Sequence, residues 1–116
     1  MTSKTYDLEE RTYRFAKACR ILIKSLPKTM SNIEDGKQLI RSSGSTGANY
    51  IEANEHLGPK DFLMRLKIAR KEAKESEYWL RLLSSMNESY SKEINPLQKE
   101  ALEIKKILSA IIQKSS

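Results

Sequence analysis

The sequence predicts an all-α protein, an antiparallel up-and-down four-helix bundle that forms one domain over residues 1–116. Two observations lead to this prediction. Apolar and small residues recur at alternating steps of three and four in four separate segments, which places them on one face of an α-helix. The chain also contains only 4 Gly and 3 Pro, a composition typical of helices. Short connections between four amphipathic helices favour an antiparallel bundle, which buries all four apolar faces.

The first helix is predicted over about residues 7–26. Asp7 suits its N-cap position, and Pro27 marks its end. Cys19 falls on the apolar face, and no second cysteine exists to pair with it. We therefore expect Cys19 to fill the core rather than to act as a reactive thiol. The apolar face repeats through Leu8, Thr12, Phe15, Cys19, Leu22 and Leu26.

The second helix is predicted over about residues 32–56, and its centre is unusual. Residues 42–48 read Ser-Ser-Gly-Ser-Thr-Gly-Ala, and each glycine costs a helix about 1 kcal/mol. This composition favours a loop, whereas in a bundle small side chains let neighbouring helices approach closely. From spacing alone, both interpretations fit residues 42–47. The inward face of a helix here would contain Ile33, Gly36, Ile40, Ser43, Gly47, Tyr50, Asn54 and Leu57.

The third helix is predicted over residues 59–86. Gly58 can end the preceding helix, and Pro59 suits a first helical turn, where its missing N–H would lack a partner anyway. At about 1.5 Å per residue this helix is roughly 42 Å long, so it organises the whole bundle. Its inward face contains Phe62, Leu66, Ala69, Ala73, Ser76, Leu80 and Leu83.

The fourth helix is predicted over about residues 96–113. Residues 87–94 are mostly polar and are interpreted as a connector. Asn95 followed by Pro96 matches a cap and a first-turn proline, which places the start of the helix there. Its buried face is expected to contain Leu97, Ala101, Ile104, Leu108 and Ile111.

The composition also indicates where we expect the protein in the cell and which partners its charge permits. No stretch approaches the roughly 18 uninterrupted apolar residues of a membrane span, and the first residues lack the apolar segment of a signal peptide. A single cysteine fits a reducing compartment, so we expect the protein in the cytoplasm. The net charge of +6 permits a nucleic acid or another anionic partner.

No residue pattern indicates catalysis, a metal or a cofactor. His56 is the only histidine, and together with Cys19 it cannot complete a zinc site. Glu52 and Glu55 lack the following histidine of di-iron helix bundles. Residues 42–47 lack the lysine of a phosphate-binding loop. We therefore expect a protein that is not an enzyme and that holds no metal or cofactor.

Two stretches resemble a known family. Residues 38–55 read Gln-Leu-Ile-Arg-Ser-Ser-Gly-Ser-Thr-Gly-Ala-Asn-Tyr-Ile-Glu-Ala-Asn-Glu, and residues 67–83 read Lys-Ile-Ala-Arg-Lys-Glu-Ala-Lys-Glu-Ser-Glu-Tyr-Trp-Leu-Arg-Leu-Leu. They resemble the four-helix-bundle family of 23S rRNA intervening-sequence proteins, which includes accessory proteins of diversity-generating retroelements. The motif that carries the resemblance is Ser45, Asn49 and Glu52.

The resemblance covers about residues 38–83 closely and the outer helices in outline. It implies that residues 42–47 are helical and that the bundle assembles into a ring, typically a homopentamer. Members often come from open reading frames inside bacterial ribosomal RNA genes. The resemblance further implies nucleic-acid binding and, for the retroelement relatives, a reverse transcriptase as partner.

One candidate site is a line of cations on the third helix. Lys60, Lys67, Lys74 and Arg81 are spaced by seven residues and drift only about 20° per step, so they follow one line along the helix. A row of cations can follow the repeating phosphates of a nucleic acid. The alternative is a solvated face on which Lys71 pairs with Glu75, and Lys74 with Glu77 or Tyr78. The candidate nucleic-acid-binding residues are Lys60, Lys67, Lys71, Lys74, Tyr78 and Arg81.

A second candidate is the row Arg41, Ser45, Asn49 and Glu52 on the second helix. Steps of four, four and three place these side chains on one face. Because a buried polar group needs a hydrogen-bond partner, we interpret the row as a structural contact with a neighbouring helix or subunit. A recognition surface is the alternative.

Aromatic residues beside lysines can stack on unpaired bases. Trp79 lies on the wide apolar stripe of the third helix, so we expect it to pack in the core or at an interface. Tyr78 lies beside the cations and is the better stacking candidate.

The resulting hypothesis is a ring of bundles that binds nucleic acid, RNA rather than DNA, by backbone electrostatics. The alternative is a scaffold or accessory subunit for a protein partner such as a reverse transcriptase or a ribosomal protein.

Overall fold

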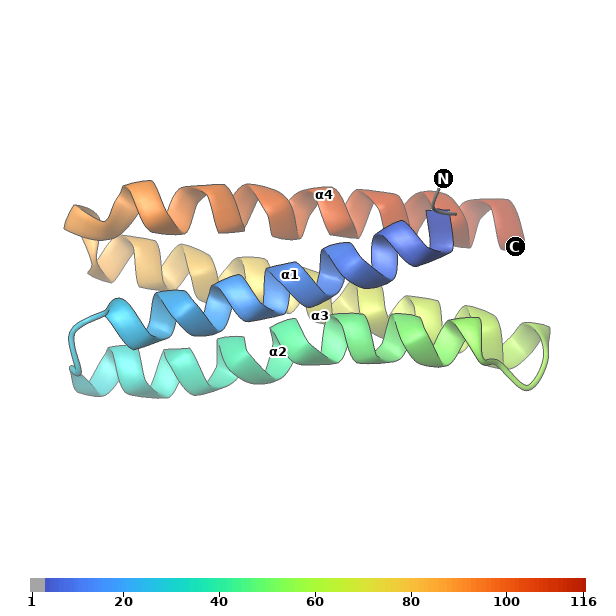
Figure 1. Cartoon of the computed structure of the whole chain (residues 1–116), viewed down its shortest axis with the longest axis horizontal. Coiled ribbons are helices and arrows are strands. Elements are labelled where there is room, and N and C mark those ends of the chain that lie inside the picture. The colour runs from blue at the N-terminus through green and yellow to red at the C-terminus, as the bar shows by residue number, and fades with distance from the viewer. Residues whose placement is uncertain (1–3) are drawn as a thin grey trace.

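The structure is a computed structural model that describes residues 4–116, with side chains described from Leu8 onward. Consecutive α-helices run antiparallel to one another (Figure 1). The predicted all-α, up-and-down bundle is therefore confirmed. Its elements are α1 (Lys4–Ser25), α2 (Met30–Asn54), α3 (Pro59–Met86), a short 3₁₀ helix η1 (Glu88–Tyr90) and α4 (Ser91–Ser115).

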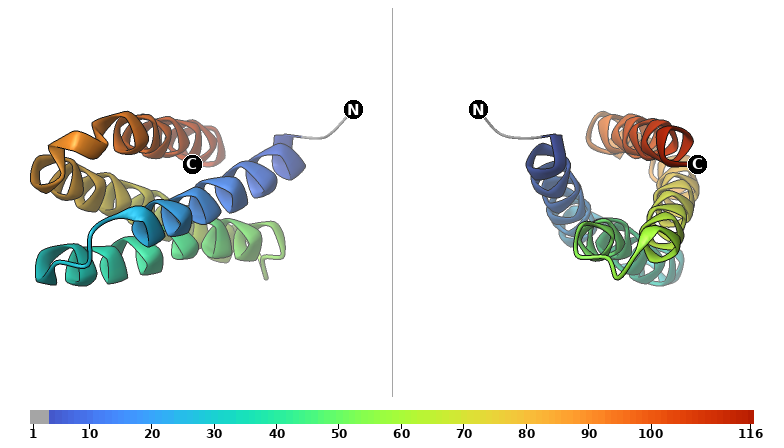
Figure 2. Two further views of the ribbon diagram at one scale, coloured as in Figure 1. Left: turned by 60° about the vertical axis from the view of Figure 1, so that its left-hand side comes forward. Right: turned by 90° about the vertical axis from the view of Figure 1, so that its right-hand side faces the viewer.

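The four helices lie along an arc rather than on the corners of a square. The molecule measures 44 × 28 × 19 Å along its principal axes. Among the described residues, the two inner helices, α2 and α3, contact each other most extensively, α3 also packs closely on α4, and α1 contacts α4 only slightly. Seen end-on, α1 and α4 lie at the two ends of the arc (Figure 2). α3 therefore packs against both α2 and α4.

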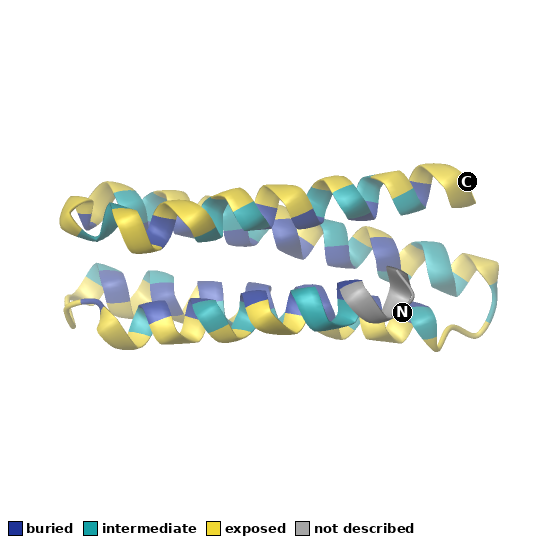
Figure 3. Cartoon of the chain, turned by 45° about the horizontal axis from the view of Figure 1, so that its top comes forward, coloured by how far each residue is buried: buried dark blue, intermediate teal, exposed yellow. Residues whose placement is uncertain are grey.

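Buried residues line the inward faces of the helices, and exposed residues cover the outward faces (Figure 3). Every residue of the apolar face predicted for the first helix is buried, including Cys19 at 0% exposure. In α3 the predicted face is buried except at its first residue, Phe62, which is partly buried. Periodicity alone thus predicted the core faces of these two helices.

The small-residue centre of α2 is helical, as the resemblance implied. It packs against two helices at once, which explains its composition. Towards α1, a Cβ added at Gly47 would lie only 2.9 Å from Thr12 Oγ1. Towards α3, Ser42 Oγ and Ser76 Oγ are 2.8 Å apart and share a hydrogen bond. Larger side chains would push these helices apart.

The predicted inward face of α2 was partly wrong. Ile33 and Leu57 are exposed, whereas Leu39 is completely buried and was not in the predicted series. Because α2 lies between α1 and α3, its buried face is wider than the single stripe that the spacing suggested. The buried residues of α2 are Asn32, Gly36, Leu39, Ser42, Ser43, Thr46, Gly47, Tyr50 and Ala53.

Two glycines of α2 give a direct test of this packing. Gly47→Ala is expected to lower stability by about 1 kcal/mol or more, because the new Cβ crowds Thr12, which is completely buried. Gly44→Ala is the matched control: its Cβ meets only the end of the exposed Arg20 side chain, 3.2 Å away. The control should gain up to about 1 kcal/mol from helix propensity. Equal melting temperatures for the two variants would contradict the close approach of α1 and α2.

In the first half of the chain, three helix ends differ from the predictions by two residues or more. α1 begins at Lys4, so Asp7 lies inside the helix and is not its cap. α2 begins at Met30 instead of residue 32, because Thr29 caps it by accepting a hydrogen bond from the Asn32 N–H (3.2 Å). α2 ends at Asn54 instead of residue 56.

The start of α3 is as predicted. Gly58 adopts φ +143°, a value that L side chains rarely adopt, and Pro59 is the first helical residue. Beside it, the exposed His56 accepts a hydrogen bond from the Gly58 N–H through Nδ1 (3.0 Å). These residues form the tight connection between α2 and α3.

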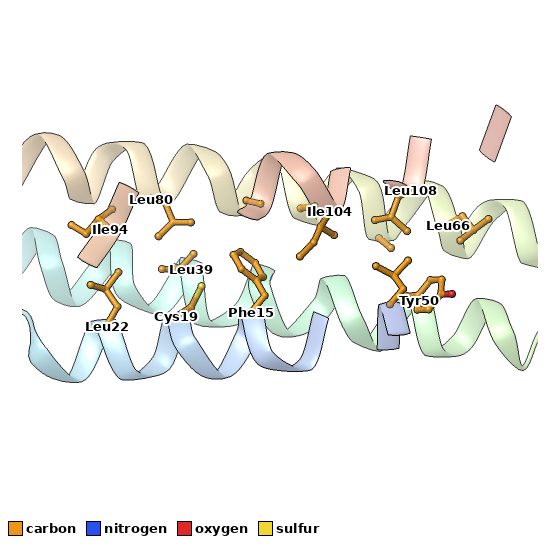
Figure 4. Packing of buried hydrophobic residues seen from close by; sticks show 14 of the residues in the cluster. Phe15, Cys19, Leu22, Leu39, Tyr50, Leu66, Leu80, Ile94, Ile104 and Leu108 are labelled. Atoms are coloured by element: carbon orange, nitrogen blue, oxygen red, sulfur yellow. The ribbon is translucent and has the colours of Figure 1, made fainter. Parts of the chain in front are cut away.

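The predicted start of α4 was wrong by five residues. The helix begins at Ser91, and Pro96 lies inside it rather than in its first turn. The physical reason is tertiary packing: Ile94 is completely buried and points into the same core as Leu80 and Leu22 (Figure 4). Residues 87–94, which the sequence analysis interpreted as a connector, therefore fold mainly as η1 and the first turn of α4.

A buried pair of amides closes the end of the bundle where α2 begins and α3 ends. Asn32 Nδ2 donates to Asn87 Oδ1, and Asn87 Nδ2 donates to Asn32 Oδ1, both at 2.8 Å. The two amides also donate to the carbonyls of Pro27 (3.0 Å) and Leu83 (2.8 Å). This pair joins the start of α2, the connection between α1 and α2, and the end of α3. It also gives the buried amide groups their hydrogen-bond partners. Sequence analysis did not identify it.

Candidate nucleic-acid interface

The candidate cations form one continuous row on the outside of α3. Its members are seven, four or three residues apart, so they follow one face of the helix, and every member is exposed. From its first to its last member it rises about 32 Å. We call this set the α3 basic row: Lys60, Lys67, Lys71, Lys74, Tyr78 and Arg81.

The opposite face of α3 fixes the orientation of the row. That face is buried between α2 and α4 and includes Leu66, Ala73 and Leu80, all at 0% exposure. Because helical residues three, four and seven positions apart share a face, burying this stripe directs the basic row away from the core. The exposure of the row is thus a consequence of the core packing.

The cations of the row have no acidic partner in the described part of the chain. None of the five takes part in an ion pair there: every ion pair involves other residues. The alternative pairs, Lys71 with Glu75 and Lys74 with Glu77, are not formed. The row is therefore positively charged along its length.

The four acidic residues of α3 are all turned towards other partners. Arg41 of α2 binds both Glu75 and Glu72, the latter at 3.6 Å between Nη1 and Oε1. On the other side, Gln98 Nε2 of α4 donates to Glu77 Oε2 (2.9 Å). Asp61 accepts from the Leu57 N–H (3.0 Å) and lies 3.6 Å from Arg65 Nε.

The predicted row on α2, Arg41, Ser45, Asn49 and Glu52, is divided between the contact with α3 and the solvent-exposed surface. Arg41 reaches α3 through the ion pairs described above. Asn49 Nδ2 donates to Ser45 Oγ (3.0 Å), and Arg65 Nη1 of α3 donates to Asn49 Oδ1 (3.5 Å). Arg41 and Asn49 thus join α2 to α3, whereas Ser45 accepts from Asn49 within α2. Glu52 is exposed and makes no ion pair with any described residue.

The aromatic residues occupy different environments. Trp79 is partly buried and packs against the core, and its Nε1 finds no acceptor among the described residues. Tyr78 is 52% exposed, and its ring lies 5.1 Å from the Trp79 ring, edge to face. Tyr50 is buried, and Tyr13 is exposed on α1. Tyr78 is thus the aromatic residue that the fold brings to the basic row.

Cys19 is the only cysteine of the chain. It is completely buried, and this burial raises the pKa of its thiol to about 12. In the part of the chain that the structure describes, no three His, Cys, Asp or Glu side chains could hold a metal ion together. No described helix is long and apolar enough to cross a membrane.

Comparison with known proteins identifies the family. The sequence profile described as "23S rRNA-intervening sequence protein" matches residues 4–110. The chain belongs to this family. The family profile covers all of α1, α2 and α3 and most of α4, so it includes the α3 basic row.

A solved structure supports the family assignment. The chain is similar to a protein of unknown function from the S23 ribosomal protein family of Bacteroides thetaiotaomicron VPI-5482, known from a crystal structure. The two share 33% sequence identity and superpose with a TM-score of 0.86, over 96% of this chain and 99% of the other. No curated protein matches the sequence. The family and its fold are thus established together.

Proposed function

We propose that this member of the 23S rRNA-intervening sequence protein family binds nucleic acid without catalysis, and RNA in preference to DNA. The contacts are electrostatic, between phosphates and the cations of the α3 basic row. The observation that carries this proposal is the arrangement of the charges on α3. Five cations face outward without ion pairs among the described residues. The carboxylates of the same helix instead contact α2, α4 or the connection between α2 and α3.

This arrangement suits a phosphate backbone better than a random basic surface does. A row of about 32 Å offers successive cations to successive phosphates, and each contact releases a condensed counterion. The net charge of +6 adds a favourable long-range attraction. The family description refers to 23S rRNA, so RNA is the ligand to test first.

We further propose that the protein forms a homo-oligomeric ring, a pentamer as the family resemblance implies. A groove on the outer face of α1 and α2 supports this proposal, because it exposes apolar surface at Tyr13, Ala48 and Ile51. In a ring, every subunit presents its own α3 basic row. Weak contacts then combine, and the overall affinity exceeds that of a single row.

The same apolar groove supports a second candidate function. It could receive a different protein, so that the bundle acts as a scaffold or accessory subunit for a reverse transcriptase or a ribosomal protein. A pull-down from the native host distinguishes the two. A partner that survives nuclease treatment favours the scaffold, and loss of all partners favours direct nucleic-acid binding.

Size-exclusion chromatography with light scattering, with and without a mixed RNA pool, tests the proposed function. We expect a stable pentamer that co-elutes with RNA at low salt and releases it as salt rises. A pentamer that carries no RNA at any salt would contradict nucleic-acid binding and favour the protein partner. A monomer would contradict the ring.

A further inference from the structure

The exposed face of α3 that carries the α3 basic row also presents two residues that are not cations. Between Lys60 and Arg81 the steps of four and three pass through Met64 and Tyr78, and both are exposed. Met64 lies in a shallow depression that is lined by Leu63, Ile68 and the first three lysines of the row. An electrostatic contact with phosphates alone gives no role to apolar side chains on this line.

Tyr78 is held in a defined place on the row. It lies one turn after Lys74 and one turn before Arg81, about 6 and 4.5 Å along the helix axis. Its ring packs edge to face against Trp79, with 5.1 Å between the centroids and 73° between the planes. Trp79 in turn packs against the core. About half of the Tyr78 side chain nevertheless remains open to solvent, between two cations.

We propose that the α3 basic row binds an unpaired strand, in which a base stacks on Tyr78 while Lys74 and Arg81 hold the phosphates on either side. This inference rests on the nucleic-acid binding proposed above and adds the class of ligand. In a duplex the bases stack on one another, and their faces are closed to a tyrosine on a helix surface. An unpaired strand offers both its phosphates and its base faces, the combination that aromatic and basic side chains recognise together.

The test compares two RNA probes and a small set of variants by fluorescence anisotropy at low salt. The probes are a labelled oligouridylate, whose bases are unpaired, and an RNA duplex of the same length. For the wild type we expect tighter binding of the oligouridylate. Tyr78→Ala should weaken binding of the oligouridylate about tenfold, the lower part of the range for base–aromatic stacking, and should leave duplex binding unchanged. Tyr78→Phe should retain wild-type affinity.

Two controls separate stacking from other effects. Ile21→Ala removes a similarly exposed side chain from α1, 58% against 52% for Tyr78, away from the row and outside the α1–α2 groove, and should change neither affinity. Tyr78→Leu keeps an apolar side chain without an aromatic face, so retention of wild-type affinity by this variant would overturn the proposal. Circular dichroism verifies that the variants fold, as the exposure of Tyr78 leads us to expect. Emission from Trp79, the only tryptophan, should change when the oligouridylate binds and should not change with the duplex.

The outcomes distinguish this inference from the function on which it rests. Salt-dependent binding of both probes that does not depend on Tyr78 would overturn the stacking proposal and leave nucleic-acid binding in place. An equal loss on both probes for Tyr78→Ala would also overturn it, since no preference for unpaired bases would remain. Failure of the wild type to bind either probe at low salt would overturn both.

Discussion

Replacement of Lys67, Lys71 and Lys74 by glutamate together is expected to lower the affinity for RNA at least about 100-fold at low salt. The variant would lose three of the proposed phosphate contacts and gain three repulsive charges at the centre of the α3 basic row. The fold should be retained, because all three side chains are exposed and make no ion pair with described residues, and lysine and glutamate have similar helix propensities. Anisotropy with labelled RNA measures the loss, and circular dichroism verifies the fold.

A second triple variant provides a control of equal net charge. Lys92, Lys99 and Lys106 of α4 have the same seven-residue spacing and are exposed. Their row also contains the acidic Glu103, which lies 3.5 Å from Lys106. Replacement of these three lysines by glutamate should lower RNA affinity much less, through the general change in charge alone. Equal losses for the two triple variants would show that the α3 basic row is not the site.

Arg41→Met is expected to lower the free energy of unfolding by about 2–3 kcal/mol. Glu72 is only 8% exposed, and its Oε1 makes no hydrogen bond, so the nearby Arg41 guanidinium is its compensation. Removing the arginine leaves a buried carboxylate without a counter-charge. The expected loss is below that of a completely buried pair, because the Arg41 side chain is itself about half exposed. Urea denaturation measures the change.

Two further variants test whether the loss of stability comes from the buried Glu72 carboxylate. The double variant Arg41→Met, Glu72→Leu should recover most of the lost stability, since it removes the uncompensated charge as well. Arg14→Met breaks the exposed ion pair with Glu10 and should cost no more than about 0.5 kcal/mol. A loss for Arg41→Met as small as that for Arg14→Met would contradict the role of Arg41 as the partner of the α3 acids.

Much of the fold follows from sequence because local signals and core packing agree. The four-three spacing predicted the buried faces of α1 and α3, and Gly58 followed by Pro59 predicted the start of α3. The start of α4 could not be predicted in this way, because Asn95 and Pro96 form a strong local signal for a helix start. The burial of Ile94 outweighs that signal, and it depends on contacts with other helices.

The candidate site was predictable in part for a similar reason. The spacing of the cations was sufficient to predict a row on one face of α3. Spacing also suggested that Lys71 and Glu75 could pair, since they are four residues apart. It could not show that Arg41, on another helix, binds Glu75 instead. The charge of the row therefore depends on a tertiary contact that only the structure reveals.

The salt dependence of RNA affinity tests the central claim, that the α3 basic row binds phosphates, most directly. If all five cations contact an unpaired strand, the logarithm of the binding constant should fall with the logarithm of salt concentration with a slope of about −3.5 per subunit, about −0.7 for each contact. In the variant with Lys67, Lys71 and Lys74 replaced, the slope should fall to about −1.4, since two contacts remain. A slope near zero for the wild type, or equal slopes for the two proteins, would contradict the account.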